Sequence, residues 1–130
     1  MSDPGRGAVL GLVIVGGSFE RAHAALLMAV GAAAMDRAVV VFATGRGVLA
    51  LCRDWSGLDG ADGDAVLRDR GVAGLDALRN AARELGVRLM ACESGLRGAG
   101  IAADALLDGV ERSGVPSFLL AAGTGQLLAV

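Results

Sequence analysis

The side chain best placed to do chemistry is the thiol of Cys92, which directly follows the apolar segment 87–91. This segment has the pattern of a strand, and ligand sites of parallel sheets lie beyond the carboxyl ends of the strands. Residues 94–96 are expected to open a helical turn whose backbone amides favour a thiolate, and Arg97 could add positive charge. Glu93 would oppose this, because a neighbouring carboxylate raises the pKa of a thiol. Position alone leaves two roles open for Cys92, a reactive thiolate and a buried structural cysteine.

Two further residues of reactive type lie in apolar surroundings. Cys52 ends the apolar segment 48–52, which favours core packing of its thiol. His23, the single histidine, lies within an apolar helical pattern that favours a packing or surface role over a general base. One histidine and two unpaired cysteines show no spacing typical of zinc ligands, so no metal site is predicted. The sequence leaves open whether Cys52 and Cys92 come within bonding distance.

Two glycine-containing loops follow predicted strands and are expected at the same edge of the sheet as the thiol. The first consists of Gly16, Gly17 and Ser18. It could bind an anion at the start of the next helix, although a tight strand-to-helix turn explains the same residues. It matches neither glycine pattern of nucleotide-binding loops, so no nucleotide site is predicted. In the second loop Arg46 follows Gly45 and could contact an anion.

Trp55 and Leu58 are apolar side chains in a loop that is otherwise rich in glycine and aspartate. Apolar groups in a polar loop suggest a surface covered by another molecule, most simply by a second subunit. The acids between Asp59 and Asp64 are predicted to be solvated, because the ligand pattern of a calcium loop is absent.

Hydrophobic patterning predicts alternating strands and helices along the chain. Strands are expected at residues 8–15, 38–43, 87–91, 110–111 and 126–130. Helices are expected at residues 19–35, with Ser18 as the N-cap, and at 48–55, 64–70, 75–85, 96–99, 101–107 and 116–122. Such alternation is typical of βαβ units. The predicted fold class is therefore α/β, as a three-layer α/β/α domain with a mostly parallel sheet of about five strands.

The composition is that of one globular domain. Hydrophobic residues make up 54% of the 130 residues, which is ample for a core and excludes intrinsic disorder. We expect residues 1–7 to be a flexible N-terminus and residues 8–130 to form a single domain. The net charge of −2 disfavours nucleic-acid binding through bulk charge. The longest apolar run, residues 24–35, is shorter than the roughly 20 residues that span a membrane. Two cysteines without a CxxC pair point to a cytoplasmic protein.

The order of these features resembles the DsrE/DsrF family, whose members are small α/β proteins linked to sulfur relay and sulfur oxidation. The resemblance covers nearly the whole chain. It rests on residues 12–15 before the Gly/Ser turn, the alanine-rich residues 21–35, residues 39–42 with Gly45 and Gly47 after them, and residues 89–92 followed by Gly98 or Gly100, Ile101 and residues 106–110. Family members typically carry a cysteine at the end of the last of these strands, and Cys92 occupies that position.

The resemblance implies that Cys92 accepts sulfur and carries it as a persulfide. The chain is then expected to be a cytoplasmic sulfur-transfer or thiol-redox protein that needs neither a metal nor an organic cofactor. Arg97 and Gly98 supply the Arg-Gly step that often follows the cysteine in sulfur-carrier members. Expected partners are copies of the chain, in a homo-trimer or homo-hexamer, together with sulfur donor and acceptor proteins; neither nucleic acid nor a membrane is expected. Whether such a carrier counts as an enzyme is left open, since alone it turns over no substrate.

An alternative of a different class is a non-catalytic oligomeric module that binds a small ligand. Its cleft would lie at the carboxyl ends of the strands and be built from Gly16, Gly17, Ser18, Gly45, Arg46, Ser94, Gly95 and Arg97. Accessibility of Cys92 in the native protein separates the two, because a buried and inert thiol favours the binding module. A flavin site is disfavoured because aromatic residues make up only 3% of the chain.

Overall fold

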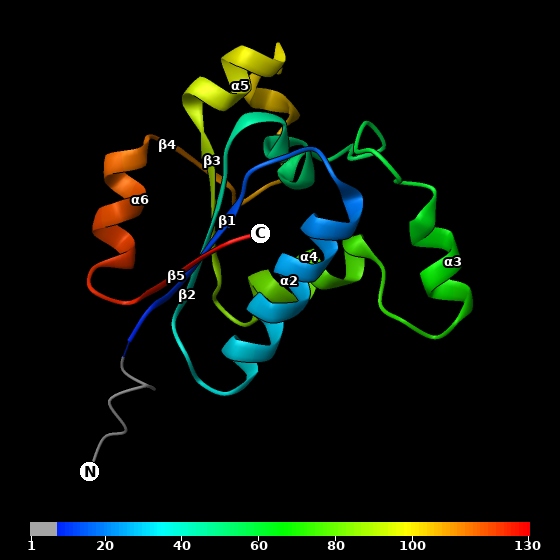
Figure 1. Ribbon diagram of the computed structural model, residues 1–130, viewed down its shortest axis with the longest axis horizontal. Helices are drawn as coiled ribbons and strands as arrows, with labels where there is room; N and C mark the ends of the chain where they lie inside the picture. Colours follow the sequence, from blue (N-terminus) through cyan, green and yellow to red (C-terminus); the bar gives the residue numbers. More distant parts are fainter. Residues whose placement is uncertain (1–7) are drawn as a thin grey trace.

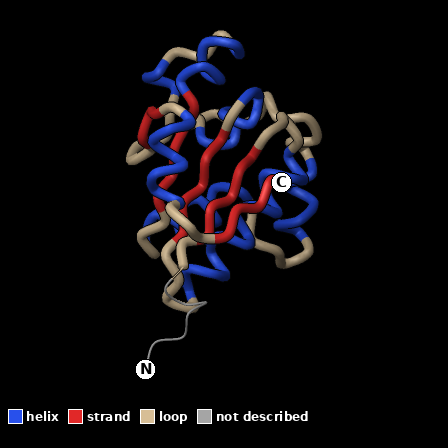
Figure 2. The backbone as a smooth tube through the Cα atoms, turned by 60° about the vertical axis from the view of Figure 1, so that its left-hand side comes forward, coloured by secondary structure: helices blue, strands red, loops and turns tan. Residues whose placement is uncertain are grey.

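One parallel sheet organises residues 8–130, the part of the chain that the computed structural model describes. The strand order is β4-β3-β2-β1-β5, and every neighbouring pair runs parallel. The strands are β1 (Leu10–Ile14), β2 (Val39–Ala43), β3 (Arg88–Cys92), β4 (Glu111–Ser113) and β5 (Gln126–Ala129). Figure 2 shows them side by side through the middle of the molecule. The expectation for residues 1–7 lies outside the described residues.

Helices cover both faces of this sheet (Figure 1). They are α2 (Phe19–Ala34), α3 (Gly63–Asp69), α4 (Leu75–Glu84), α5 (Glu93–Ala99) and α6 (Val115–Ala122), with the short 3-10 helices η1 (Gly45–Leu51) and η2 (Ala103–Ala105). Helices α2 and α4 pack on one face with α3 outside them, whereas α6 lies on the other face. The predicted three-layer α/β/α class is confirmed. None of the helices in residues 8–130 is both long and apolar enough to cross a membrane.

Alternate residues of the central strands enter two separate cores. The larger core lies under α2 and α4 and includes Leu12, Val41 and Leu89. The smaller core lies under α6, where the rings of Phe42 and Phe118 stack with their centroids 4.7 Å apart. Because both faces of β1, β2 and β3 are covered, these strands read as continuous apolar runs in the sequence.

The start of α2 and the end of α4 are set by residues close to them in sequence, as predicted. The Ser18 hydroxyl accepts a hydrogen bond from the Arg21 amide at 3.3 Å, as expected of an N-cap. Helix α4 ends at Glu84, and Gly86 follows with a φ of +80°, a left-handed conformation that glycine adopts without strain.

The helix predicted for residues 101–107 is wrong. Only the single turn η2 forms there, because the backbone of this segment pairs with the chain after η1 instead. The Leu107 amide donates to the Leu51 carbonyl at 2.9 Å, and the Arg53 amide donates to the Ala105 carbonyl at 2.9 Å. Leu106 thereby becomes buried beside Cys52.

The helix predicted for residues 48–55 is also misplaced. The observed helix η1 begins at Gly45, inside the predicted loop, and ends at Leu51. Gly47 permits this early start, since a Cβ at that position would lie 2.3 Å from the Ile14 carbonyl oxygen. Helix η1 therefore packs directly against the carboxyl end of β1, and its position sets the surroundings of the residues that follow β3.

Candidate functional site

Cys92 is the last residue of β3, and α5 begins at the next residue. Its side chain faces the smaller core with Met90 and Phe42, and only 2% of the residue is exposed. The Sγ atom lies 3.0 Å from the Oγ atom of Ser94, which is an exposed residue. The thiol is thus a buried group whose nearest polar neighbour reaches solvent.

Burial raises the pKa of the Cys92 thiol, but the hydrogen bonds around it lower the pKa by more. These bonds come from the Ser94 hydroxyl, the Gly95 amide, the Thr44 hydroxyl and the Ser94 amide. The pKa of Cys92 is consequently below its ordinary value. A cysteine whose anion accepts several hydrogen bonds can act as a nucleophile near neutral pH.

Close packing between α5 and η1 holds the Gly95 amide in place. A Cβ at Gly95 would lie 2.9 Å from the Gly45 nitrogen and 3.1 Å from a methyl group of Val48. No larger residue fits without moving the backbone, so glycine at this position is what lets α5 approach. The two predicted site residues Gly45 and Gly95, which are far apart in sequence, are therefore in direct contact.

Thr44 is the first residue of the predicted site loop 44–47, but the sequence analysis gave its hydroxyl no role. It directly follows β2, and Ala43 at the end of β2 pairs with Ala91 of β3. Thr44 and Cys92 therefore leave adjacent strands at the same level. The available signal was positional: a hydroxyl residue directly after one predicted strand and a thiol directly after the next.

The glycine loop after β1 lies beside the η1 helix and engages Arg46. A Cβ at Gly17 would lie 3.1 Å from the Nε atom of Arg46, and Arg46 donates through Nη2 to the Gly57 carbonyl at 3.3 Å. Ser18 serves as the α2 cap, and Gly16 is half-buried before it. These residues form a well-packed strand-to-helix turn at the sheet edge that also carries Cys92.

Arg97 lies in a different place from the thiol. It lines a separate cavity of about 170 Å³ whose other lining residues are Glu93, Leu96, Ile101, Ala103 and Arg112. The hydroxyls and amides near Cys92, rather than this guanidinium, supply the hydrogen bonds that lower the thiol pKa.

Cys52 packs in the larger core and His23 is buried beside Phe19, the packing roles that the sequence favoured. The Cys52 thiol donates to the Val48 carbonyl at 3.4 Å, and burial raises its pKa. Both cysteines are free thiols, and they belong to cores on opposite faces of the sheet. His23 is 8% exposed and donates through Nε2 to the Ala73 carbonyl at 2.8 Å.

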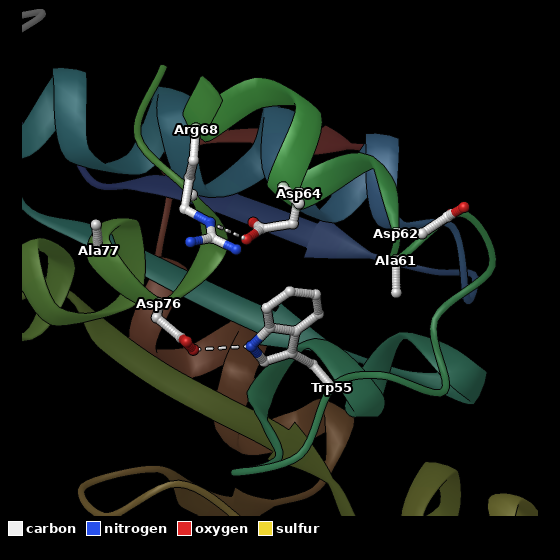
Figure 3. Close-up of a pocket in the computed structure, with 9 residues that line it drawn as sticks. Trp55, Ala61, Asp62, Asp64, Arg68, Asp76 and Ala77 are labelled. Atoms are coloured by element: carbon white, nitrogen blue, oxygen red, sulfur yellow. Dashed lines mark hydrogen bonds and ion pairs between the residues drawn. The ribbon is translucent and has the colours of Figure 1, made fainter. Parts of the chain in front are cut away.

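The prediction that Trp55 and Leu58 form an apolar surface covered by another molecule is wrong for Leu58. Leu58 is 3% exposed and belongs to the larger core. Trp55 stacks on Phe19 with ring centroids 5.7 Å apart, and its indole Nε1 donates to Asp76 Oδ1 at 2.8 Å (Figure 3). Side chains distant in sequence therefore cover Leu58, whereas Trp55 is half-buried and stacks on Phe19.

Asp64 is likewise buried rather than solvated, with 5% of the residue exposed. Its carboxylate accepts from the Leu75 amide at 2.7 Å and from Arg68 Nε at 2.9 Å, so it binds the first backbone amide of α4. Together with Trp55 it lines a cavity of about 420 Å³ (Figure 3). This cavity is separate from the site around Cys92, and the ion pair in its wall fixes the loop between α3 and α4.

Comparisons with known proteins agree with this architecture. The solved structure of the YchN protein from E. coli superposes with a TM-score of 0.70 at 18% identity, covering 95% of this chain and 99% of that one. A protein of unknown function from Methanobacterium thermoautotrophicum, MTH1491, superposes with a TM-score of 0.59 at 22% identity over the same shares. A comparison with curated proteins finds no match. The model of the DsrE/DsrF-like family matches residues 10–127, and the chain belongs to that family.

Proposed function

We propose that this chain is a cytoplasmic sulfur carrier that holds sulfane sulfur as a persulfide on Cys92. The observation that carries the proposal is the set of hydroxyl and amide donors around Sγ, which lowers the thiol pKa in spite of burial. The chain belongs to the DsrE/DsrF-like family, whose members are linked to sulfur relay, and this membership supports the same chemistry. Two free thiols with no disulfide are consistent with a reducing compartment.

The transfer is an exchange in which no net oxidation occurs. The Cys92 thiolate attacks the sulfane sulfur of a donor persulfide, so that a new S–S bond forms at Sγ while the S–S bond of the donor breaks. The electron pair of the broken bond leaves on the donor sulfur, which becomes a thiol after taking up a proton. An acceptor thiolate then attacks the outer sulfur on Cys92, and the Cys92 thiolate is released.

Access to the sulfur limits which donors can react with the isolated chain. Only 2% of Cys92 is exposed, whereas its hydrogen-bond partner Ser94 is an exposed residue. A small inorganic polysulfide needs little room beside Ser94 to reach the sulfur. A bulky alkylating reagent requires α5 or its neighbours to move, so it should react more slowly.

The test is intact-mass spectrometry of the native protein after treatment with a small polysulfide. Wild type is compared with Cys92→Ser, and Cys52→Ser serves as the matched control because its thiol is equally buried but has a raised pKa. We expect a gain of one sulfur atom in wild type and Cys52→Ser, and complete loss of that gain in Cys92→Ser.

Two results would contradict the proposal. Equal loading of both variants would show that Cys92 has no special role. Absence of loading in wild type, with Cys92 unreactive until the protein is denatured, would instead favour the non-catalytic binding module.

We further propose that the carrier is a homo-trimer or homo-hexamer. Several large apolar side chains of α6 and β5 are exposed, namely Val115, Leu119, Leu120 and Leu127, and Leu120 is 85% exposed. Contiguous exposed apolar groups of this kind are typical of subunit contacts. Sedimentation analysis should therefore give a mass three or six times that of the chain, and a monomer at micromolar concentration would contradict this part of the proposal.

A further inference from the structure

Ser113, the last residue of β4, has a buried hydroxyl that makes no hydrogen bond within the described fold. Its Oγ atom is buried, and no hydrogen-bond partner lies within reach among residues 8–130. A buried hydroxyl that leaves its hydrogen bond unmade is destabilising, and such groups are uncommon in native proteins. Ser113 is therefore a candidate for a group that finds its partner only in another state of the molecule.

Its position relative to Cys92 is fixed by the register of the sheet. Ser113 pairs with Cys92 across β3 and β4, so the two side chains leave the sheet on the same face. On the other side of β3, Thr44 follows β2 and donates a hydrogen bond to the thiol. A hydroxyl residue thus lies on each side of the thiol: Thr44, which follows β2 and is hydrogen-bonded to it, and Ser113 of β4, whose hydroxyl is unpaired among the described residues.

We infer that Ser113 is a positioning residue that donates a hydrogen bond to the outer sulfur of the Cys92 persulfide. The Ser113 hydroxyl makes no hydrogen bond to the unloaded thiol, although the two residues are paired across neighbouring strands. An S–S bond adds about 2.05 Å to the side chain of Cys92, on the face of the sheet that it shares with Ser113. This inference rests on the proposed function, because it concerns only the loaded state.

The division of roles has a chemical reason. In a persulfide anion the negative charge lies mainly on the outer sulfur, beyond the atoms that Ser94, Gly95 and Thr44 hold. A hydroxyl aimed at that sulfur stabilises the anion and slows its loss to passing thiols. Ser113 should accordingly affect the loaded protein and leave the free thiol unchanged.

The test uses Ser113→Ala with Ser117→Ala as the matched control, since Ser117 is an exposed serine of α6. Each protein is loaded with a small polysulfide and freed of excess donor. It is then exposed to a simple thiol while the persulfide is followed by intact mass. We expect the half-life of the persulfide to shorten severalfold in Ser113→Ala only. The pH midpoint for alkylation of the unloaded Cys92 should stay at the wild-type value, and the melting temperature should not fall, because the hydroxyl removed has no partner among the described residues of the unloaded protein. Ser113→Thr, which keeps the hydroxyl, should restore the long half-life.

Each alternative outcome is decisive. An unchanged half-life in Ser113→Ala would overturn the inference while leaving the proposed function intact. A shifted alkylation midpoint of the free thiol would also overturn it, since Ser113 would then act on the unloaded state. Failure of wild type to load would overturn the proposed function and the inference with it.

Discussion

Cys52 and Cys92 are buried almost equally, with 3% and 2% of their surfaces exposed, yet their pKa values move in opposite directions. Around Cys52 burial dominates, so the pKa is raised although Arg79 nearby acts to lower it. Around Cys92 burial also raises the pKa, but hydroxyl and amide donors lower it by more. Burial alone therefore does not distinguish an inert cysteine from a reactive one in this fold.

The presence or absence of donors to the thiolate explains the difference. Burial and the nearby Asp54 carboxylate raise the pKa of Cys52, whose thiol itself donates to the Val48 carbonyl. The Arg79 guanidinium is already occupied by Asp76 and by the carbonyls of Ala50 and Cys52. At Cys92 the neighbouring groups donate instead, and they stabilise the thiolate. The pKa values of two thiols in one small domain are therefore shifted in opposite directions by the groups around them.

The largest effect on the pKa difference between Cys92 and Cys52 is expected from a substitution that moves α5 away from η1. Gly95→Ala places a Cβ 2.9 Å from the Gly45 nitrogen, which is backbone and cannot swing aside. We expect a net loss of about 1–3 kcal/mol in the free energy of unfolding, because overpacking outweighs the gain in helix propensity. The same shift removes the Gly95 amide from Cys92, so the thiol pKa should rise towards that of Cys52. Urea unfolding and the pH profile of alkylation measure the two effects.

Gly98→Ala is the matched control, because a Cβ at Gly98 of the same helix meets nothing within 4 Å. It should stabilise the protein by about 0.5–1 kcal/mol and leave the alkylation profile unchanged. Equal effects of the two substitutions on stability would show that the contact between α5 and η1 does not hold the site together.

Most of the fold could be predicted from the sequence because its central strands are buried on both faces. A continuous apolar run such as 38–43 has few alternatives once loops rich in glycine flank it, and β2 (Val39–Ala43) matches it closely. The position of Cys92 at the end of a strand was predictable for the same reason. The cap at Ser18 followed from local side-chain chemistry.

The rest depended on partners that are distant in sequence. Residues 101–107 have helical character, but hydrogen bonds to Leu51 and Arg53 draw the segment into another conformation. In the sequence Asp64 resembles a solvated acid, but in the folded chain it is buried and accepts a hydrogen bond from the distant Leu75 amide. Thr44 joins the thiol site only because β2 and β3 end at one level. Single-sequence patterns report local preferences and contain no information about such pairings.

The smallest effect on the pKa difference between the two thiols is expected from the removal of one hydroxyl group beside Cys92. Ser94→Ala removes the hydroxyl whose Oγ lies 3.0 Å from the Cys92 sulfur. Because that hydroxyl stabilises the thiolate, its loss raises the pKa, and the alkylation curve of Cys92 should move to higher pH. The rate near neutral pH should then fall severalfold, since less thiolate is present, while the rate at high pH should match that of wild type. Alkylation by a small haloacetamide, followed by mass spectrometry across the pH range, measures both limits.

Ser56→Ala controls for the loss of an exposed serine hydroxyl elsewhere, since Ser56 lies in the loop before α3. It should leave the curve of Cys92 unchanged. In both variants Cys52 should still react at higher pH than Cys92, because burial is the largest cause of its raised pKa and neither substitution alters that burial. If Ser94→Ala lowered the rate equally at every pH, the hydroxyl would control access to the sulfur and not its ionisation. The contrast between the two thiols would then have to rest on the amides and Thr44 alone.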